Sequence, residues 1–237
     1  MFLAHYGVAL AAKRVAPQTS LGTTVFAAQF LDLLWPLLLL VGLESVRVVP
    51  GLMAASSLDF VHYPISHSLL MAVFWAAVAG GVYYAVRRNR PGGIVVAVLV
   101  ASHWLLDAPM HRPDLLLWPG SDIRVGGGIW NSLAATLALE FAIFGGGILV
   151  YVRRTHAAGR IGSIGLWSML ALLVVFYLGS LFAPPPADPR SLAVGGLGLW
   201  LFVPWAAWVD RRRSASRGRI EGGEEVGIAV VDVPMKV

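Results

Sequence analysis

Long apolar segments separated by short polar connections make up most of the chain. With a membrane span taken as about 20 mostly apolar residues, this pattern predicts transmembrane helices at about residues 22–43, 67–86, 93–110, 129–152, 163–183 and 192–209. Helix breakers bound these segments, among them Pro91-Gly92-Gly93, Gly126-Gly127-Gly128 and Pro184-Pro185-Pro186. We therefore expect an all-α fold, a polytopic membrane helical bundle of about six transmembrane helices that takes up residues 1–210.

The first apolar segment, residues 1–12, is too short to cross a bilayer. We expect it to form a short re-entrant or interfacial helix, and the sequence leaves open which side of the membrane His5 approaches. No cleavable signal peptide is expected, because Lys13 and Arg14 follow this apolar segment, whereas the cationic residues of a secretory signal precede it. The first spans must then direct the chain to the membrane.

The composition supports membrane insertion. Of the 237 residues, 57% are hydrophobic and 13% are charged, and the mean hydropathy is +0.73, whereas an average soluble domain has about 25% charged residues. The formal net charge of +5 comes from short basic clusters between apolar spans, which is typical of topology signals and not of a nucleic-acid-binding surface. The expected partner is the lipid bilayer, with no nucleic acid, and the sequence leaves the oligomeric state open.

The basic residues also predict the orientation. An even number of spans puts both chain ends on one side of the membrane, and 14 of the 18 lysine and arginine residues fall on that side. The exceptions are Arg47, Arg112, Arg124 and Arg190. By the positive-inside rule, we expect an integral protein of the bacterial inner (plasma) membrane with a cytoplasmic C-terminus. Residues 211–237 are expected to form a disordered polar tail on that side.

Ionisable side chains within the apolar segments are few, namely Asp32, His103, Asp107 and Glu140. An Asp at a helix centre costs about 2.5 to 3.5 kcal/mol to insert, so each such group requires a partner. For Glu140, the partner could be Asn131 or a neighbouring helix. Because the sequence contains no cysteine, a metal ion here would be held by imidazole and carboxylate groups.

His103 and Asp107, in SHWLLDAPMH, are four residues apart and therefore share one face of a helix. With His67 at the same surface and Asp32 in the first span, they are expected to line one cavity. Such a set of imidazoles and carboxylates is typical of a zinc or similar divalent site. Two plainer interpretations stay open: a neutral hydrogen bond between helices could satisfy the pair, and Gln29 could be the partner of Asp32.

The stretch HYPISHSLL, residues 62–70, holds two more histidines at the mouth of the second span. We expect Ser66 to cap this helix, so that His67 lies in its first turn and His62 in the loop before it. A turn from loop to helix would bring the two rings together, and the free amide groups of the helix N-terminus would suit an anion such as phosphate. His111, just beyond the third span, is interpreted as a solvated loop residue.

Four segments in a fixed order carry these groups: AHYGVAL with His5, QFLDLLWP with Asp32, HYPISHSLL with His62 and His67, and SHWLLDAP with His103 and Asp107. Over about residues 1–140, this order resembles the motifs of the YdjM-like family. That family consists of membrane-bound proteins expected to be metal-dependent hydrolases, distantly similar to zinc-dependent phospholipase C and P1-type nucleases. The resemblance implies a divalent metal, most simply zinc, held by these six side chains. It also implies a catalytic role for Asp32, His67, His103 and Asp107.

Three features depart from the family pattern. The acidic motif of the family carries more than one carboxylate, whereas Asp32 stands alone, with Asp59 as a distant substitute. Tyr63 replaces the arginine that follows the first histidine of HYPISHSLL, and Ser66 replaces the threonine that precedes the second. The lost carboxylate bears on whether a site for several metal ions is complete.

The sequence leaves three functions open. In the first, an enzyme uses a bound metal to hydrolyse a phosphoester, with a lipid-like or envelope substrate. In the second, Asp32, His103 and Glu140 form the protonation path of a proton-coupled transporter, which needs no metal. In the third, the chain is a non-catalytic membrane scaffold. The histidines at the membrane mouth favour the hydrolase, because a proton path does not require them.

Overall fold

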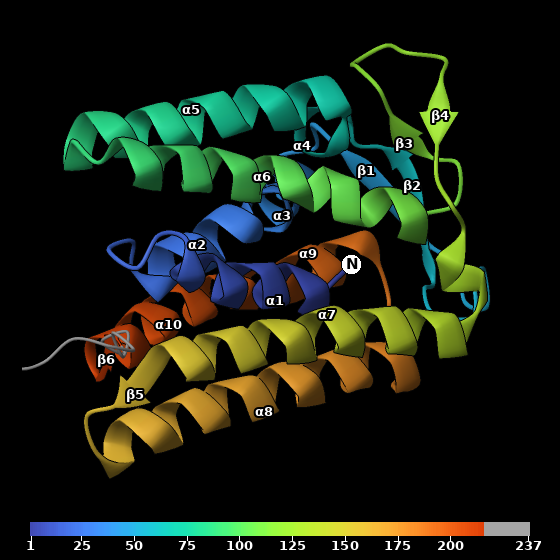
Figure 1. Ribbon diagram of the computed structural model, residues 1–237. Helices are drawn as coiled ribbons and strands as arrows, with labels where there is room; N and C mark the ends of the chain where they lie inside the picture. Colours follow the sequence, from blue (N-terminus) through green and yellow to red (C-terminus); the bar gives the residue numbers. More distant parts are fainter. Residues whose placement is uncertain (216–237) are drawn as a thin grey trace, which may run out of the picture.

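The computed structural model describes residues 1–215, which form a bundle whose long helices lie side by side (Figure 1). The α-helices are α1 (Leu3–Ala11), α2 (Leu21–Ala28), α3 (Phe30–Leu40), α4 (Pro64–His67), α5 (Leu69–Arg87), α6 (Arg90–Met110), α7 (Leu133–Arg154), α8 (Arg160–Phe182), α9 (Pro189–Gly196) and α10 (Phe202–Arg211). Short 3-10 helices lie between them, namely η1 (Ala12–Arg14), η2 (Ile129–Asn131) and η3 (Leu197–Leu201). The expected all-α polytopic bundle is confirmed.

Five helical segments of the described part are long and apolar enough to cross a membrane. They are α5, α6, α7, α8 and the run Pro189–Arg211, which comprises α9, η3 and α10. A sixth is present if α2 and α3, which meet at Gln29 with a bend of 56°, form one broken span. These segments agree with the six predicted ones. The fourth begins later than predicted, because η2 is a separate turn and Ser132 caps α7.

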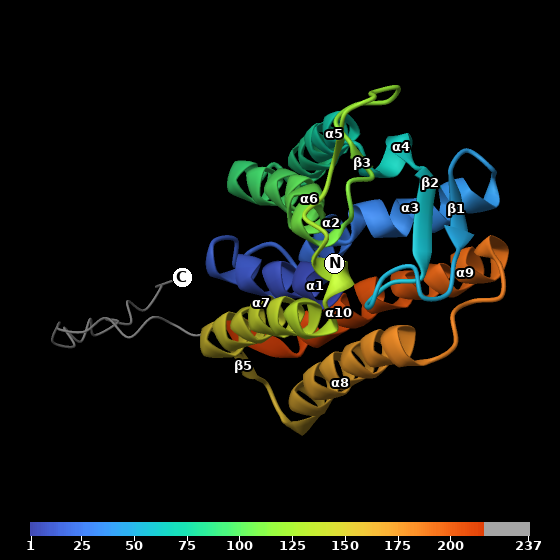
Figure 2. The same cartoon turned by 90° about the vertical axis from the view of Figure 1, so that its right-hand side faces the viewer.

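Helix α1 lies inside the bundle and not at an interface (Figures 1 and 2). It packs against α2 and α7, and most of its side chains are buried. The contact with α7 depends on glycine, since a Cβ atom at Gly147 would lie 2.0 Å from the carbonyl oxygen of Gly7. Of the two alternatives for this segment, the interfacial helix is therefore wrong. The short N-terminal helix is part of the protein core.

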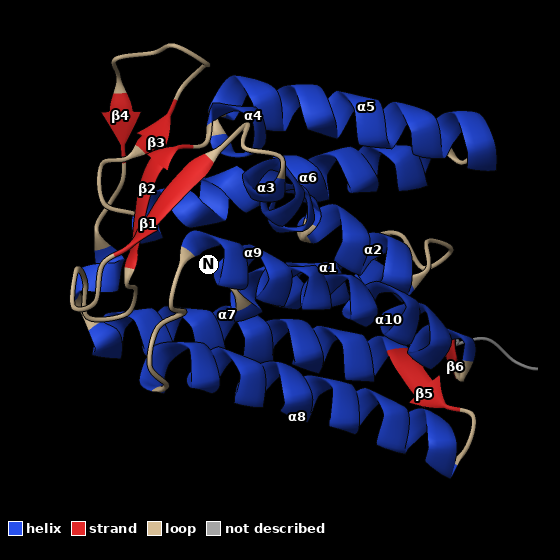
Figure 3. Ribbon diagram, turned by 180° about the vertical axis from the view of Figure 1, so that it is seen from behind, coloured by secondary structure: helices blue, strands red, loops and turns tan. Residues whose placement is uncertain are grey.

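Short antiparallel strand pairs lie at the two ends of the bundle (Figure 3). At one end β1 (Ser45–Val48) pairs with β2 (Leu58–His62), and β3 (Leu115–Leu116) pairs with β4 (Arg124–Val125); at the other end β5 (Thr155–Ala157) pairs with β6 (Arg213–Ala215). We call the end that carries β1 to β4 the hairpin end. The sequence analysis missed these strands, although the alternation of valine with polar residues in SVRV is a strand signal.

The segment predicted to be a disordered tail is ordered at its start. Arg211 ends α10, and β6 follows directly and pairs with β5. The remainder of the predicted tail, residues 216–237, lies outside the described residues.

Candidate metal centre

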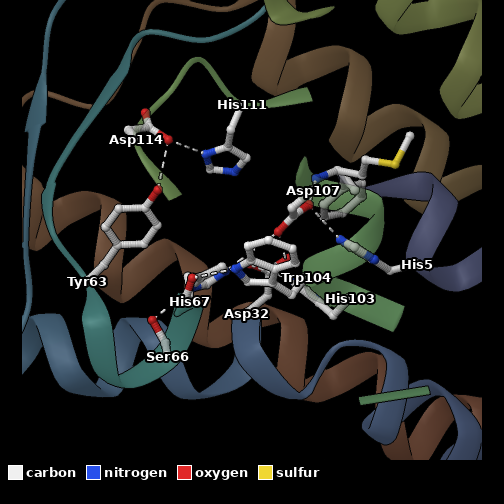
Figure 4. Close-up of polar contacts among 12 residues, drawn as sticks. His5, Asp32, Tyr63, Ser66, His67, His103, Trp104, Asp107, His111 and Asp114 are labelled. Atoms are coloured by element: carbon white, nitrogen blue, oxygen red, sulfur yellow. Dashed lines mark hydrogen bonds and ion pairs between the residues drawn. The ribbon is translucent and has the colours of Figure 1, made fainter. Parts of the chain in front are cut away.

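Side chains from four helices meet in the interior of the bundle, toward the hairpin end (Figure 4). His5 comes from α1, Asp32 from the first turn of α3, His67 from the end of α4, and His103 and Asp107 from one face of α6. Ligand atoms of His5, His103 and Asp107 lie within 4.8 Å of one another, as do those of Asp32, His67 and His103. These five residues, which could hold a metal ion, are called the metal centre below. Five of the six side chains predicted as metal ligands are thus brought together.

Asp107 lies between the ring of His5 on one side and the rings of His67 and His103 on the other. Its Oδ2 atom is 3.3 Å from Nε2 of His103 and 3.8 Å from Nε2 of His67. Oδ1 of Asp32 lies on the same side, 3.5 Å from Nε2 of His67 and 3.6 Å from Nε2 of His103. The other oxygen of Asp107, Oδ1, is 3.1 Å from Nε2 of His5. The carboxylate of Asp107 therefore faces His5 with one oxygen and faces His67 and His103 with the other.

The ring of His103 is oriented by a main-chain acceptor. Its Nδ1 atom donates a hydrogen bond to the carbonyl oxygen of Ala28, 2.7 Å away. Because a carbonyl oxygen can only accept, the neutral ring carries its lone pair on Nε2. Ala28 is the last residue of α2, and the end of a helix leaves carbonyl groups without a partner in the same helix. The bend between α2 and α3 thereby supplies the acceptor.

The ring of His67 is oriented in the same way by a side chain. The hydroxyl of Ser66 donates to Oε2 of Glu44 at 2.6 Å, and Nδ1 of His67 lies 2.7 Å from the same hydroxyl oxygen. Since the hydroxyl proton is used on the carboxylate, Nδ1 of His67 is the donor and its lone pair is on Nε2. Oε1 of Glu44 accepts from the amides of Ile65 and Ser66, so Glu44 holds the N-terminus of α4.

This arrangement corrects two sequence-based interpretations. The N-cap of α5 is Ser68, whose hydroxyl oxygen accepts from the amide of Met71, and not Ser66. Glu44 was not recognised as a functional residue, because it precedes a hairpin that the sequence analysis did not predict. A carboxylate placed at the end of an apolar segment, just before the strand pattern SVRV, was the available signal.

The donor set of the metal centre fits a divalent cation. Nε2 atoms of two imidazoles and oxygens of two carboxylates face one another, and Nε2 of His103 is buried without a hydrogen bond to any described residue. A cation placed between such atoms would be attracted to all of them. Imidazole nitrogen and carboxylate oxygen are ligands of zinc, and metal-binding histidines typically donate from their second nitrogen to a carbonyl or a carboxylate. His103 donates from Nδ1 to a carbonyl directly. His67 donates from Nδ1 to the hydroxyl of Ser66, which in turn donates to a carboxylate.

His5 reaches the metal centre from the protein core. Its ring stacks on the ring of His103, with centroids 3.7 Å apart and planes 9° from parallel. The amino group of Met1 pairs with the same oxygen of Asp107 that contacts His5. Nδ1 of His5 is buried and has no hydrogen-bond partner within residues 1–215. The question of which side His5 approaches is thereby answered, because it lies inside the bundle.

Glu140 of α7 holds the N-terminus of α1. Its Oε1 atom accepts from the amide of Phe2 at 2.7 Å, and Oε2 accepts from the amide of Ala4 at 2.8 Å. Amides of a first helical turn have no partner within their own helix, so the carboxylate satisfies them from outside. Glu140 therefore interacts with α1 and not with Asn131, the partner suggested by the sequence.

Two residues considered from the sequence lie apart from the metal centre. His62 is the last residue of β2, opposite Ser45, with an exposed side chain. The structure does not bring it to the centre, because the strand extends through His62 and the chain turns only at α4. Asp59 cannot substitute for the missing acid, since it pairs with Arg47, whose Nε lies 2.9 Å from Oδ2, and with Arg112.

His111 is buried, contrary to its interpretation as a solvated loop residue. Its Nδ1 atom lies 2.9 Å from Oδ1 of Asp114, and the hydroxyl of Tyr63 donates to the same oxygen at 2.8 Å. Burial lowers the pKa of His111, and burial beside Asp114 raises the pKa of Tyr63. The sequence analysis missed Asp114. The spacing of three residues after His111 was the signal that would have suggested the pair.

A comparison with known families agrees with this geometry. Residues 2–184 match the model of the family described as YdjM inner membrane protein. The chain belongs to this family. The match includes every residue of the metal centre, so the motifs that suggested the YdjM family are the ones that the fold brings together. Together with the apolar helices, membership makes this a multi-pass integral protein of the inner membrane. No curated protein and no solved structure matches the chain.

Proposed function

We propose that the protein is a membrane-bound, metal-dependent hydrolase of phosphoesters. A divalent metal, most simply zinc, would be held by Asp32, His67, His103 and Asp107. His5 would contribute a further metal ligand on the far side of Asp107. One observation carries the proposal: two histidines from separate helices have Nδ1 engaged and both direct Nε2 toward a shared pair of carboxylates. The phosphoester class rests on the resemblance of the motifs.

The residues of the metal centre differ in their access to the outside. Asp32 is 21% exposed, whereas Asp107 is 2% exposed and His103 is fully buried. Asp32 also lines a cavity of about 610 Å³ that borders the metal centre, so an incoming phosphoryl group would approach beside it. A divalent ion at this place would lower the pKa of a bound water and polarise a phosphoryl oxygen. Asp107 and the two engaged histidines would keep the ligand geometry fixed.

Transport by a proton path is less well supported. That mechanism requires Glu140 to exchange protons with Asp32 and His103. Both carboxylate oxygens of Glu140 instead accept main-chain hydrogen bonds at the N-terminus of α1, which favours a structural role for this carboxylate. A protonated Glu140 would leave an amide of Phe2 or Ala4 facing a hydroxyl group.

Metal content is the test. Elemental analysis of detergent-purified protein, without chelator, should find zinc, manganese or iron at one or more equivalents per chain, and His103→Ala and Asp107→Ala should lose it. His62→Ala is the matched control, because this exposed histidine lies outside the metal centre and its variant should keep the metal. Hydrolysis of the soluble diester bis(4-nitrophenyl) phosphate should follow metal content across the series. A folded protein with no metal even after incubation with zinc would overturn the proposal.

A further inference from the structure

The metal centre borders a large cavity that is mostly apolar away from the centre. The cavity has a volume of about 610 Å³, within the range of small-molecule sites. Its polar end is formed by Asp32, His67 and Asp107. From there it extends along the aromatic side chains of Trp35 and Phe176 toward helices α8 and α9. A ligand that fills it would need a polar group at one end and a hydrocarbon part at the other.

The far end of the cavity lies between two membrane-spanning segments. Its lining there includes Gly179 and Ser180 of α8 and Gly195 and Gly196 of α9. In Figure 2, which views the hairpin end, these helices are joined by the connection after Phe182. Gly179, Ser180 and Gly195 are exposed, and a Cβ atom added at Gly179 or Gly195 would meet nothing within 4 Å. Because exposed residues of both helices line it, the cavity reaches the surface of the bundle between α8 and α9.

The hairpin end of the cavity is covered. The loop between β1 and β2 contributes residues 53–57 to its lining. The amide of Ala55 in this loop donates to the carbonyl oxygen of Trp130 in η2 at 2.9 Å, which ties the loop across the bundle. Met53 of the same loop is buried. The loop therefore covers the cavity at the hairpin end, whereas small residues line the cavity between α8 and α9.

We propose that the ligand of this cavity is a phosphoester with a long hydrocarbon chain, which enters sideways from the bilayer between α8 and α9. Its phosphoryl group lies at Asp32 and Asp107, and its chain lies along Trp35 and Phe176 in the gap. The placement of the phosphoryl group rests on the proposed function. The lateral opening and the binding of the chain rest on the cavity alone.

Photo-crosslinking in lipid nanodiscs tests the proposal. The probe is phosphatidylglycerol with a diazirine near the end of one acyl chain, and labelled peptides are located by mass spectrometry. We expect labels on buried cavity residues such as Trp35 and Leu199, which bulk lipid around the bundle does not contact. Exposed residues such as Val175 and Val194 face outward and report ordinary lipid contact in the same sample.

Two variants close the gap without disturbing the packing. Gly195→Phe and Gly179→Phe each place a ring in open space at the gap, so both should lose the label on Trp35 while the label on Val175 remains. Gly145→Phe is the matched control, since this glycine of α7 also has open space and lies outside the cavity, and it should keep the cavity label. Unchanged labelling of Trp35 in both gap variants would overturn the lateral opening.

The outcomes separate this inference from the proposed function. Metal bound at the centre together with an unlabelled cavity in the wild-type protein would overturn the lipid ligand and leave the hydrolase intact. A labelled cavity in a protein that binds no metal would support the lipid ligand and overturn the hydrolase. If both hold, the two gap variants should lose activity on long-chain substrates, whereas Gly145→Phe should keep it.

Discussion

The hydroxyl of Ser66 donates a hydrogen bond to Oε2 of Glu44, 2.6 Å away, and this contact decides which nitrogen of the neutral His67 ring carries the proton. Without the carboxylate, the hydroxyl proton would be free to turn toward Nδ1. The ring could then place a proton on Nε2, where it would exclude a metal. The selection of the tautomer is therefore made one residue away from the ligand itself.

Ser66→Ala is expected to weaken metal binding without removing any ligand. Loss of such a supporting hydrogen bond typically costs about 10- to 100-fold in metal affinity. Competition with a zinc-binding dye should show a decrease of this size, whereas Ser56→Ala, in the loop between β1 and β2, should show none. Equal affinities for the two variants would mean that Ser66 does not orient His67.

Glu140→Gln should destabilise the protein and loosen α1. The amide side chain offers one acceptor where the carboxylate offers two, so one buried amide of Phe2 or Ala4 would face an NH₂ group. An unsatisfied buried group costs about 1–3 kcal/mol. Denaturant unfolding in detergent should show this loss, and Asp122→Asn at an exposed position should not. If Glu140→Gln is as stable as the wild-type protein, Glu140 does not anchor the helix.

Gly147→Ala should be poorly tolerated, because the added methyl group would overlap the carbonyl of Gly7. Overpacking of this kind typically costs about 1–3 kcal/mol. The neighbouring Gly146 faces open space, so Gly146→Ala should be neutral or slightly stabilising, given the higher helix propensity of alanine. Thermal unfolding of the two variants side by side measures the difference, and identical midpoints would contradict the close contact between α1 and α7.

His111 should make folding stability depend on pH. Burial lowers its pKa in the folded protein despite the opposing effects of Asp114 and Asp107. Below the ordinary pKa near 6.5 the unfolded chain therefore binds more protons than the folded one. This contribution to stability is fully present above about pH 6.5 and is lost as the pH falls toward the lower value of the folded state. The difference in unfolding free energy between wild type and His111→Asn should shrink over that interval. A constant difference would contradict the lowered pKa.

The membrane spans could be predicted because they depend on local composition. Runs of about 20 apolar residues predicted the five unbroken segments and the region of the bent pair α2 and α3, and the spacing of His103 and Asp107 predicted their shared face. The contributions of Glu44 and Asp114 could not be predicted in this way. Glu44 approaches His67 only because β1 and β2 form a hairpin, and Asp114 meets Tyr63 across 51 residues of sequence.

The bend at Gln29 could not be predicted from the sequence either. Residues 22–43 form an apolar run that contains neither glycine nor proline near position 29, so nothing local marks the break. The bend instead meets a requirement of the tertiary structure, because it releases the carbonyl of Ala28 for His103. His62 shows the reverse case. Its closeness to His67 in the sequence suggested a shared site, whereas a strand that was not predicted keeps His62 outside the metal centre.

The burial of α1 has a consequence for the order of biogenesis. This helix is made before its anchor, because Glu140 is synthesised 136 residues after Ala4. A helix of this length cannot remain in a bilayer by itself as a span, and long-range contacts form only after the intervening chain is present. Helix α1 can therefore take its final position only after α7 has been made. His5 joins the metal centre at this docking step, so a chain that ends before α7 lacks the complete centre.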